Sequence, residues 1–312
     1  MLAGRAFPHS NLLSVDDLED ADVAQILDEA ERWTAFNRQP QRQDDRLHGL
    51  SQVNLFFENS TRTLLSFEIA GRRLGAQVST MPVAQSSVRK GESLLDTVRT
   101  IDAMGADLLV LRHADGGAAQ AVAAAVRCCV INGGDGINQH PTQALLDALT
   151  IKRRKGRIEG LIVAICGDIR HSRVANSNRR LLPRLGAKVR LVAPAGLLPD
   201  DAAGLPTFTD MDEGIAGADI VMMLRIQRER MEDALTGLLG DFHSAYGLTR
   251  DRLARAAPDA IVMHPGPMNR GIEISGELAD DPRRSAILDQ VENGVAVRMA
   301  CLDLLTRARR GA

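Results

Sequence analysis

Hydrophobic positions follow two alternating patterns along this chain. Strand-like runs, typical of buried parallel strands, occupy residues 51–57, 76–81, 108–111, 128–131, 161–166, 188–192, 219–224 and 260–264. Apolar residues recur at helical spacing in residues 14–36, 64–74, 92–104, 118–126, 144–154 and 291–309, and in a segment that ends at residue 185. This alternation predicts an α/β fold of mostly parallel sheets flanked by helices.

Local signals predict several helix ends and loops. Ser14 precedes an acidic first turn and is predicted to cap the first helix. Gly75 and Gly186 each follow a helical segment and are predicted to end it. Residues 82–91 and 241–248 lack periodicity, so we expect irregular loops there.

The length of the chain predicts two domains. Its 312 residues exceed the usual size of a single hydrophobic core. The basic, glycine-punctuated stretch 152–160 is the candidate boundary. We therefore expect one domain over residues 1–151 and a second over residues 152–290, with the helix of residues 291–312 packed back on the first.

Polar clusters follow six of the strand-like runs, drawn from both halves of the chain. They are residues 60–63, 112–113, 138–143, 168–173, 225–227 and 264–270. Ligands of parallel α/β sheets bind outside the carboxyl ends of the strands. The clusters therefore predict a functional site at this edge, in a cleft between the two domains.

The first cluster has the composition of a phosphate site. Ser60, Thr61, Arg62 and Thr63 fall where a buried strand turns into a helix, and the N-terminus of a helix favours an anion. Hydroxyl donors and a planar guanidinium suit phosphate better than a lone carboxylate. The alternative interpretation is that Ser60 only caps the helix.

Composition narrows the class of partners. The chain is 45% apolar and 25% charged, with a formal charge of −2, which argues against nucleic-acid and membrane-surface partners. The N-terminus lacks a signal-peptide core and no run approaches a membrane span. The four cysteines lack paired metal spacing, so no metal site is expected. Cys128, Cys129 and Cys166 lie in strand-like apolar stretches and are predicted to be buried free thiols, which indicates a cytoplasmic location.

Motifs in both halves resemble one enzyme family. The chain resembles the carbamoyl phosphate signature of the carbamoyltransferases at residues 57–63 and 66–68. It resembles further motifs of the same family, in the same order, at residues 90–93, 112–113 and 140–147. Residues 224–230 and 264–271 resemble the branch of the family that is specific for aspartate. The resemblance covers nearly the whole chain.

The resemblance implies transfer of the carbamoyl group of carbamoyl phosphate to the amine of L-aspartate, an early step of pyrimidine biosynthesis, without a cofactor. It implies a carbamoyl phosphate-binding domain over residues 1–151 and an aspartate-binding domain over residues 152–290. Catalytic roles fall on Arg62, Thr63, Lys90, Arg112 and His140. Substrate binding also falls on Ser60, Thr61, Ser86, Gln143, Arg173, Arg225, Gln227, Pro265, Gly266 and Pro267.

Within this assignment, the resemblance gives each group a role. The 60–63 turn and Arg112 hold the phosphate, while Thr63, Arg112 and His140 face the carbonyl oxygen. Gln143 orients the carbamoyl NH₂ through its amide oxygen, with the carbonyls of the 265–266 segment nearby. Arg173 and Arg225 grip the two carboxylates of aspartate, with Gln227 beside them. No general base stands out, so the departing phosphate is expected to take the amine proton.

Assembly is also implied by the resemblance. Ser86 and Lys90 belong to a loop that in this family reaches the site of a neighbouring subunit, so we expect a homotrimer with shared active sites. A higher assembly with a regulatory or dihydroorotase-like chain stays open.

Three other functions compete with this interpretation. Ornithine carbamoyltransferase shares the phosphate half, but its second half carries a His-Cys-Leu-Pro motif where this chain has His-Pro-Gly-Pro at residues 264–267. A non-catalytic paralogue should have lost one of the catalytic residues. A nucleotide-binding oxidoreductase should carry GxGxxG, which Gly167-Asp168-Ile169 lacks.

Some polar residues are weaker candidates. His113, His171 and His264 can serve packing or hydrogen bonding at strand ends, and Asp168 can act through a neighbour. Singly, His140, Arg173 and Arg225 could be a helix cap and solvated surface charges. Leu64 and Asn176 depart from the basic residues common in the family, which bears on local packing and ion pairs.

Overall fold

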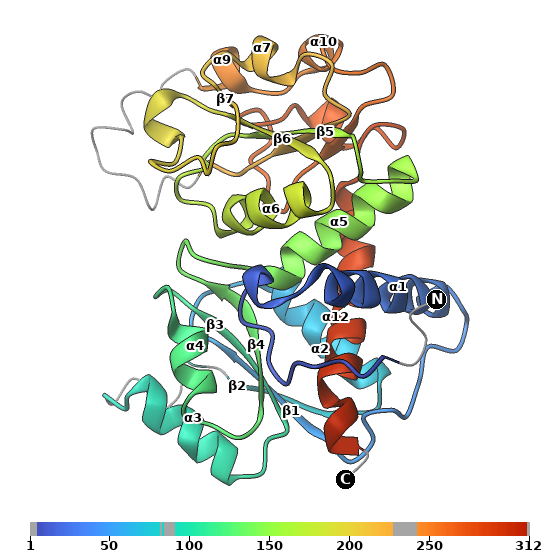
Figure 1. The fold of residues 1–312 in the computed structure, drawn as a ribbon, viewed down its shortest axis with the longest axis vertical. Helices are drawn as coiled ribbons and strands as arrows, with labels where there is room; N and C mark the ends of the chain where they lie inside the picture. Colours follow the sequence, from blue (N-terminus) through green and yellow to red (C-terminus); the bar gives the residue numbers. More distant parts are fainter. Residues whose placement is uncertain (1–4, 82, 84–90, 227–241, 311–312) are drawn as a thin grey trace. The chain divides into compact units, whose positions relative to one another are not determined.

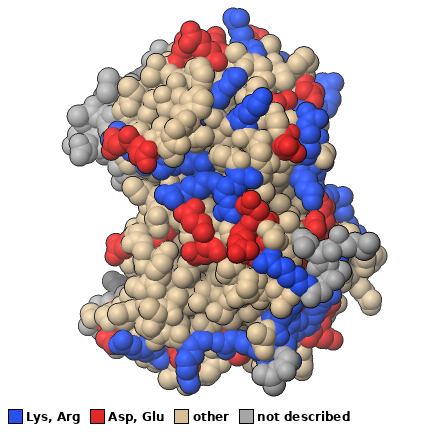
Figure 2. Space-filling model, viewed as in Figure 1, with Lys and Arg blue, Asp and Glu red and all other residues tan. Residues whose placement is uncertain are grey.

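The computed structural model describes residues 5–81, 83, 91–226 and 242–310. Contacts divide the chain into two compact units, one of Met1–Leu149 with Val291–Ala312 and one of Thr150–Gln290. Figure 1 shows a parallel sheet with helices on both faces in each unit. Basic and acidic side chains both occur on the visible face of each unit (Figure 2). Within the described residues, no helix is both long enough and apolar enough to cross a bilayer.

The first unit is built on a parallel sheet with the strand order β2-β1-β3-β4. Its strands are β1 (Ser51–Phe56), β2 (Gln77–Met81), β3 (Leu108–His113) and β4 (Cys129–Asp135). Its helices are the 3₁₀ turn η1 (Val15–Asp17), α1 (Asp20–Asn37), α2 (Thr61–Arg73), α3 (Leu94–Ala103) and α4 (Ala118–Ala123), and parts of α5 (Pro141–Lys155) and α12 (Ile287–Arg310).

Successive side chains along each strand of this sheet point to opposite faces. Leu55 and Leu109 pack with α3 and α4 in one apolar cluster. The positions next to these in each strand face α2 and α12. Gln52 Nε2 donates to the Phe67 carbonyl of α2, and Cys129 Sγ contacts the Leu305 carbonyl of α12. The sheet is therefore covered on both sides (Figure 1), as its apolar strands require.

The second unit contains a parallel sheet with the strand order β7-β6-β5-β8-β9. Its strands are β5 (Ile162–Cys166), β6 (Lys188–Val192), β7 (Thr207–Phe208), β8 (Ile220–Met223) and β9 (Ile261–Met263). Its helices are α6 (Arg173–Arg184), η4 (Ala195–Leu197), α7 (Met211–Ile215), α9 (Phe242–Tyr246), α10 (Arg250–Leu253) and α11 (Gly276–Ala279).

Side chains alternate between the two faces of the second sheet in the same way, and both faces are covered. Ala164 and Cys166 of β5 pack in an apolar cluster with Met211 and Ile215 of α7. Val163 is buried on the opposite face, along which α6 lies (Figure 1). All four cysteines of the chain are free and buried, which confirms the prediction for Cys128, Cys129 and Cys166 and adds Cys301.

Three predicted elements differ from the structure. The helix expected over residues 14–36 is two pieces, because the capping box of Ser14 closes on Asp17 in η1 and α1 begins only at Asp20. The loop expected at residues 241–248 contains the short helix α9. The last helix starts earlier than expected, at Ile287. The first and third errors lie at element ends, where capping and tertiary contacts override periodicity, and α9 is too short to show a helical period in the sequence.

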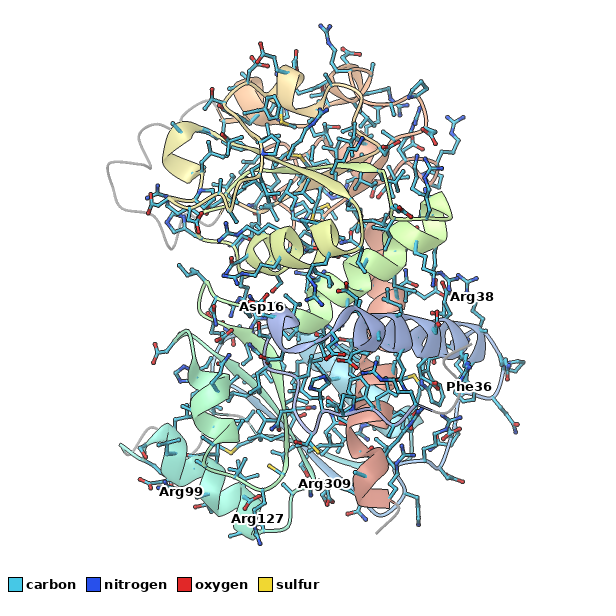
Figure 3. All side chains as sticks on the ribbon, in the orientation of Figure 1. Asp16, Phe36, Arg38, Arg99, Arg127 and Arg309 are labelled. Atoms are coloured by element: carbon cyan, nitrogen blue, oxygen red, sulfur yellow. The ribbon has the colours of Figure 1, made fainter. Side chains whose placement is uncertain are left out.

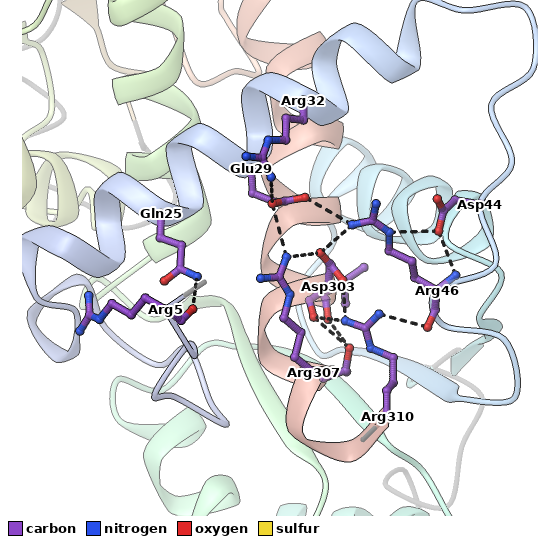
Figure 4. Close-up of polar contacts among 11 residues, drawn as sticks. Arg5, Gln25, Glu29, Arg32, Asp44, Arg46, Asp303, Arg307 and Arg310 are labelled. Carbon is purple, nitrogen blue, oxygen red and sulfur yellow. Dashed lines mark hydrogen bonds and ion pairs between the residues drawn. The ribbon is translucent and has the colours of Figure 1, made fainter. Parts of the chain in front are cut away.

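An ionic network attaches the C-terminal helix α12 to the N-terminal part of the chain (Figure 4). The Asp303 side chain is 1% exposed and pairs with Arg46, Arg307 and Arg310, at 3.2, 2.8 and 2.5 Å. Glu29 of α1 pairs with Arg46 and Arg307 as well. At the end of α12, Arg309 donates to the Arg127 carbonyl; both residues are labelled in Figure 3. These contacts explain why residues after 290 belong to the first unit.

The protonation of Asp303 follows from this network. Burial alone would raise its pKa, but hydrogen bonds and charges from Arg307 and Arg310 outweigh burial and hold the pKa below its ordinary value of 3.8. A carboxyl with a lowered pKa stabilises the fold fully above the pKa of the unfolded state. That stabilisation disappears as the pH falls through the lowered pKa.

We expect Asp303→Asn to lower the free energy of unfolding by about 2–3 kcal/mol at pH 7, because three arginines lose a buried carboxylate. The loss stays moderate because those arginines keep access to water. Urea unfolding measures it, and the difference from wild type should shrink below about pH 4. The control Asp96→Asn removes an exposed pair with Arg99, labelled in Figure 3, and should change stability by less than about 0.5 kcal/mol. Equal effects of the two variants would contradict the network's role.

Candidate functional site

Parallel topology gathers the predicted polar clusters at one edge of each sheet. In the first unit the clusters follow β1, β3 and β4, which are neighbours in the sheet. In the second unit they follow β5, β8 and β9, which are also neighbours. Because all these strands are parallel, their carboxyl ends share one edge within each unit.

The N-terminus of α2 carries the first cluster. Ser60 is the N-cap of α2, but its side chain makes no capping hydrogen bond to the first turn. Arg62 is exposed in that turn, whereas Thr63 is 5% exposed. The interpretation that Ser60 merely caps the helix therefore lacks the hydrogen bond that would support it. The backbone N–H groups of this first turn point toward the N-terminal end of α2, where an anion is favoured.

Close packing on β1 holds α2 in register. Gln52 of β1 donates to the Phe67 carbonyl of α2, as described above. Gly71 makes room for this contact, since a Cβ there would lie 2.1 Å from Gln52 Oε1. The position of the α2 N-terminus thus depends on a glycine ten residues further along the chain.

Arg112 lies at the end of β3, with its side chain held by both neighbouring strands. Its Nη1 donates to the Gly133 carbonyl of β4 at 3.1 Å. Its Nε lies 3.5 Å from Glu58 Oε2, just beyond β1. These contacts hold a half-buried guanidinium at the carboxyl edge, between the loops that follow β1 and β4.

His140 comes directly before Pro141, the first residue of α5, as the sequence predicts. It is 3% exposed, and its Nε2 lies 3.4 Å from Thr63 Oγ1. This contact joins the start of α5 to the start of α2. Gln143, in the first turn of α5, is 8% exposed and donates through Nε2 to Asp147.

A buried carboxylate organises the loop between β4 and α5. Asp135 is 1% exposed. Its Oδ2 accepts from the Gly117 amide at 2.7 Å and from Asn138 Nδ2 at 3.0 Å. Its Oδ1 accepts from Asn132 Nδ2 at 2.8 Å and from the Gln139 amide at 3.0 Å. Asp135 thereby connects the loop that carries His140 to the N-terminus of α4.

The second unit presents two arginines at its sheet edge. Arg173 is the first residue of α6 and is only 6% exposed, although the N-terminus of a helix disfavours a cation. Arg225 is half-buried just after β8, the strand beside β5. Both guanidinium groups therefore follow neighbouring strands at the carboxyl edge of the second sheet.

Asp168 and His171 form a pair at the end of β5. Asp168 is fully buried, and its Oδ1 lies 2.8 Å from His171 Nδ1 and 3.3 Å from the His171 amide. A carboxylate only accepts, so Nδ1 carries a proton and donates it to Asp168. Beside them, burial raises the pKa of the Cys166 thiol, which stays protonated.

The segment after β9 is held by a buried histidine and glutamate. His264 Nδ1 accepts from the Gly266 amide at 2.8 Å, so the other ring nitrogen donates, to Glu273 Oε1 at 3.2 Å. Glu273 Oε1 also accepts from the Asn269 amide at 2.5 Å. Both ring nitrogens of His264 therefore serve the shape of the 265–267 segment. In that segment Pro267 is exposed and the other two residues are half-buried.

Every predicted site residue that the structure describes falls at these edges. Ser60, Thr61, Arg62, Thr63, Arg112, His140 and Gln143 lie at the edge in the first unit, and Arg173, Arg225, Pro265, Gly266 and Pro267 in the second. Ser86, Lys90 and Gln227 lie outside the described residues. Among the residues described, no group of three or more His, Cys, Asp or Glu side chains could hold a metal ion.

Sequence reasoning missed the buried carboxylates Asp135, Asp147 and Glu273. For Asp135 a signal exists, because an aspartate in a glycine-rich stretch before a helix is typical of a turn that its own carboxylate closes. Asp147 and Glu273 carry no local signal that separates them from solvent-exposed acids. Of the two departures from the family pattern, Leu64 is half-buried on α2, and the Asn176 Oδ1 accepts from Arg179 Nε at 2.9 Å.

Two parallel α/β units with polar carboxyl edges define a ligand-binding α/β protein. A model for the carbamoyl-P binding domain of aspartate/ornithine carbamoyltransferase matches residues 10–153, and one for the Asp/Orn binding domain matches residues 159–305. The chain belongs to the aspartate/ornithine carbamoyltransferase family.

Relatives and solved structures cover almost the whole chain. An aspartate carbamoyltransferase catalytic subunit of Rhizorhabdus wittichii is 61% identical, over 98% of this chain and 98% of that protein. Aspartate transcarbamoylase of Trypanosoma cruzi, in complex with carbamoyl aspartate and phosphate, matches with a TM-score of 0.88 and 32% identity over 97% and 99% of the chains. Ornithine carbamoyltransferase of Thermus thermophilus matches with a TM-score of 0.84 and 26% identity over 95% and 98%. The fold is therefore shared by both branches of the family.

We expect Asp135→Asn to loosen the loop that carries His140, because an amide cannot accept all the hydrogen bonds that the carboxylate accepts. The free energy of unfolding should fall by about 2–4 kcal/mol. Amide hydrogen exchange measured by NMR should accelerate at Gly117 and Gln139, whose amides lose their acceptor. The matched control is Asp115→Asn, whose side chain is 82% exposed and which should leave both amides protected. Unchanged protection in Asp135→Asn would show that the carboxylate does not hold this loop.

Proposed function

We propose that the protein transfers the carbamoyl group of carbamoyl phosphate to the amine of L-aspartate, giving N-carbamoyl-L-aspartate and phosphate. The observation that carries this proposal is that one chain contains two sheet edges with different polar groups. The first unit has an uncapped helix N-terminus beside Arg62, Thr63 and Arg112. The second has a buried arginine at a helix N-terminus, Arg173, with Arg225 on the next strand. One edge suits a phosphate and the other a dicarboxylate.

Carbamoyl phosphate binds to the first unit. The first-turn amides of α2, with the hydroxyls of Ser60, Thr61 and Thr63, surround the phosphate, and Arg62 and Arg112 neutralise its charge. The contacts of Arg112 to Glu58 and Gly133 support this role, since they hold the guanidinium in place before the substrate arrives.

Charge stabilisation at the carbonyl oxygen is the main catalytic task. When the aspartate amine attacks the carbonyl carbon, negative charge develops on that oxygen. His140, Thr63 and Arg112 stabilise it, and the 3.4 Å contact between His140 and Thr63 supports their joint action. Donors aimed at a developing charge are usually the largest single catalytic effect, and the loss of one typically slows the reaction ~100- to 1,000-fold.

Aspartate binds to the second unit. Arg173 and Arg225 bind its two carboxylates, because a guanidinium grips a carboxylate bidentately. The 265–267 segment, shaped by His264 and Glu273, contributes backbone carbonyls to substrate binding. Gln227 is assigned beside Arg225, on the sequence alone.

The bond changes balance without a protein base. The amine nitrogen bonds to the carbonyl carbon, and the bond from that carbon to the phosphate oxygen breaks. The departing phosphate takes the proton that the amine loses. Positioning and charge stabilisation are then the whole contribution of the protein.

The first test is carbamoyl transfer by the purified protein with L-aspartate and L-ornithine as parallel acceptors. We expect product from aspartate only, because two arginines suit a second carboxylate and repel a cationic side chain. Product from ornithine would overturn the assignment of the second unit and keep that of the first. No product from either acceptor, with carbamoyl phosphate still bound, would overturn the catalytic proposal.

We propose further that the enzyme is a cytoplasmic homotrimer whose sites are shared, with Ser86 and Lys90 supplied to the site of a neighbouring copy. The exposed face of α2 supports a contact between copies. Leu65 and Ile69 lie one to two turns from Thr61 and are 49% and 39% exposed. Adjacent large apolar side chains at a surface are typical of an interface.

Subunit mixing tests the shared site. Arg62→Ala and Lys90→Ala trimers should each be nearly inactive, with losses on the order of 100-fold or more. When the two are dissociated, mixed and reassembled, about a quarter of the sites should combine an intact Arg62 with an intact Lys90 from the next copy. Activity should recover to that level.

The matched control for Arg62→Ala is Arg72→Ala, which removes an exposed arginine from the same helix and should keep full activity. Because Arg62 is exposed, its variant should unfold at the same urea concentration as wild type. Verified hybrids without recovered activity would contradict the shared site.

A further inference from the structure

Gln143 makes a contact that determines which end of its side-chain amide faces a ligand. Its Nε2 lies 3.0 Å from Asp147 Oδ1, one turn further along α5. Asp147 is fully buried and Gln143 is 8% exposed. Residues four apart lie on the same face of a helix, so α5 itself sets this geometry.

The chemistry of the pair determines the orientation of the amide. An ionised carboxylate can only accept, so the NH₂ group of Gln143 must face Asp147. Gln143 Oε1 then points to the other side, and no described residue donates to it. In the reverse orientation two acceptors would meet in a buried place. Asp147 therefore presents Gln143 as an acceptor rather than a donor.

A buried cation of the C-terminal helix lies near α5 and α2. Arg298 of α12 is 3% exposed, and its Nη1 donates to the Gly294 carbonyl at 3.1 Å. Its guanidinium lies 5.0 Å from the ring centroid of Phe67 in α2. A Cβ on Gly294 would lie 2.7 Å from Arg298 Nη1, so glycine leaves room for the guanidinium.

Arg298 lies close to α5 beside Asp147, since the same Cβ on Gly294 would lie 3.3 Å from Leu146 Cδ2, in the residue before Asp147. Burial lowers the pKa of Arg298 to about 10, while Cys301 and the Asp147 carboxylate oppose that lowering. Arg298 stays protonated at neutral pH and offsets the charge of Asp147. One buried cation thus connects α12 both to the helix that carries Gln143 and to the helix that begins with the phosphate cluster.

We propose that Asp147, supported by Arg298, is a positioning residue that makes the enzyme select a carbamoyl over an acetyl group on the same phosphate. This inference rests on the proposed function, in which Gln143 accepts a hydrogen bond from the carbamoyl NH₂. A methyl group in place of NH₂ has no hydrogen to donate. It leaves Gln143 Oε1 without that bond, so acetyl phosphate binds more weakly than carbamoyl phosphate.

The test compares dissociation constants of three probes, carbamoyl phosphate, acetyl phosphate and inorganic phosphate, by calorimetry without aspartate. In Asp147→Asn the amide of Gln143 can flip, so the ratio of the acetyl phosphate constant to the carbamoyl phosphate constant should fall roughly 3- to 10-fold. The inorganic phosphate constant should not change. A purely structural role would weaken all three probes alike and keep the ratio.

Gln143→Ala gives the second arm of the test. It should lower the ratio as far as Asp147→Asn does, and combining the two substitutions should lower it no further, because Asp147 acts through Gln143. A further fall of the ratio in the double variant would contradict the proposal that Asp147 acts through Gln143. A ratio unchanged in Asp147→Asn but lowered in Gln143→Ala would overturn the role of Asp147 alone.

Two further variants keep the test informative if Asp147→Asn does not fold. Asp147→Asn combined with Arg298→Met removes both buried charges, which leaves no unpaired ion in the core, and should show the same fall in the ratio. Asp303→Asn is the matched control: it also replaces a buried aspartate beside α12 arginines and should keep the wild-type ratio. Failure of wild type to carbamoylate aspartate would instead count against the proposed function, whatever the ratios.

Discussion

Buried carboxylates matched to N–H donors are the constraint on which both sheet edges depend. An ionised carboxylate away from water is destabilising by several kcal/mol unless hydrogen bonds and charges compensate it. Asp135 ends β4, while Asp168 and Glu273 lie in the segments after β5 and β9, and each accepts hydrogen bonds from a backbone amide and a side chain. A loop that must keep such a carboxylate satisfied has few alternative conformations. The residues that it carries are therefore held before a ligand arrives.

The same constraint separates residues that shape the site from residues that meet the substrate. His264 uses both ring nitrogens inside its own loop, and His113 Nδ1 accepts from the Asp115 amide at 3.0 Å. Their hydrogen bonds serve the local backbone. Arg173 is also buried, but it is a cation in the first turn of α6, where the helix dipole favours an anion. The partners of His264 and His113 thus show that these two histidines shape their own loops, which their sequence alone does not reveal.

The sequence predicts the α/β class, the parallel strands and the edge at which the polar clusters gather, because apolar periodicity and strand ends are local properties. It does not predict the break between η1 and α1, since Ser14 and Glu19 are both adequate caps and the choice depends on tertiary contacts. Nor does it separate Asp303 from any exposed aspartate. The pair that Asp303 forms with Arg46 spans 257 positions, so no window along the chain contains it. The roles of single site residues came from resemblance, and the geometry that supports them came from the structure.

The order of the chain has a consequence for how the first unit forms. The second unit is one continuous segment, Thr150–Gln290, inserted into the first. The first unit is completed only by Val291–Ala312, which brings Arg298 against Phe67 and Asp303 against Arg46. Until that segment is present, Asp147 lacks its buried cation and Glu29 lacks the partner that Arg307 provides. The helix that carries the phosphate cluster is therefore stabilised by residues that follow the whole second unit in the chain, through contacts that close long loops.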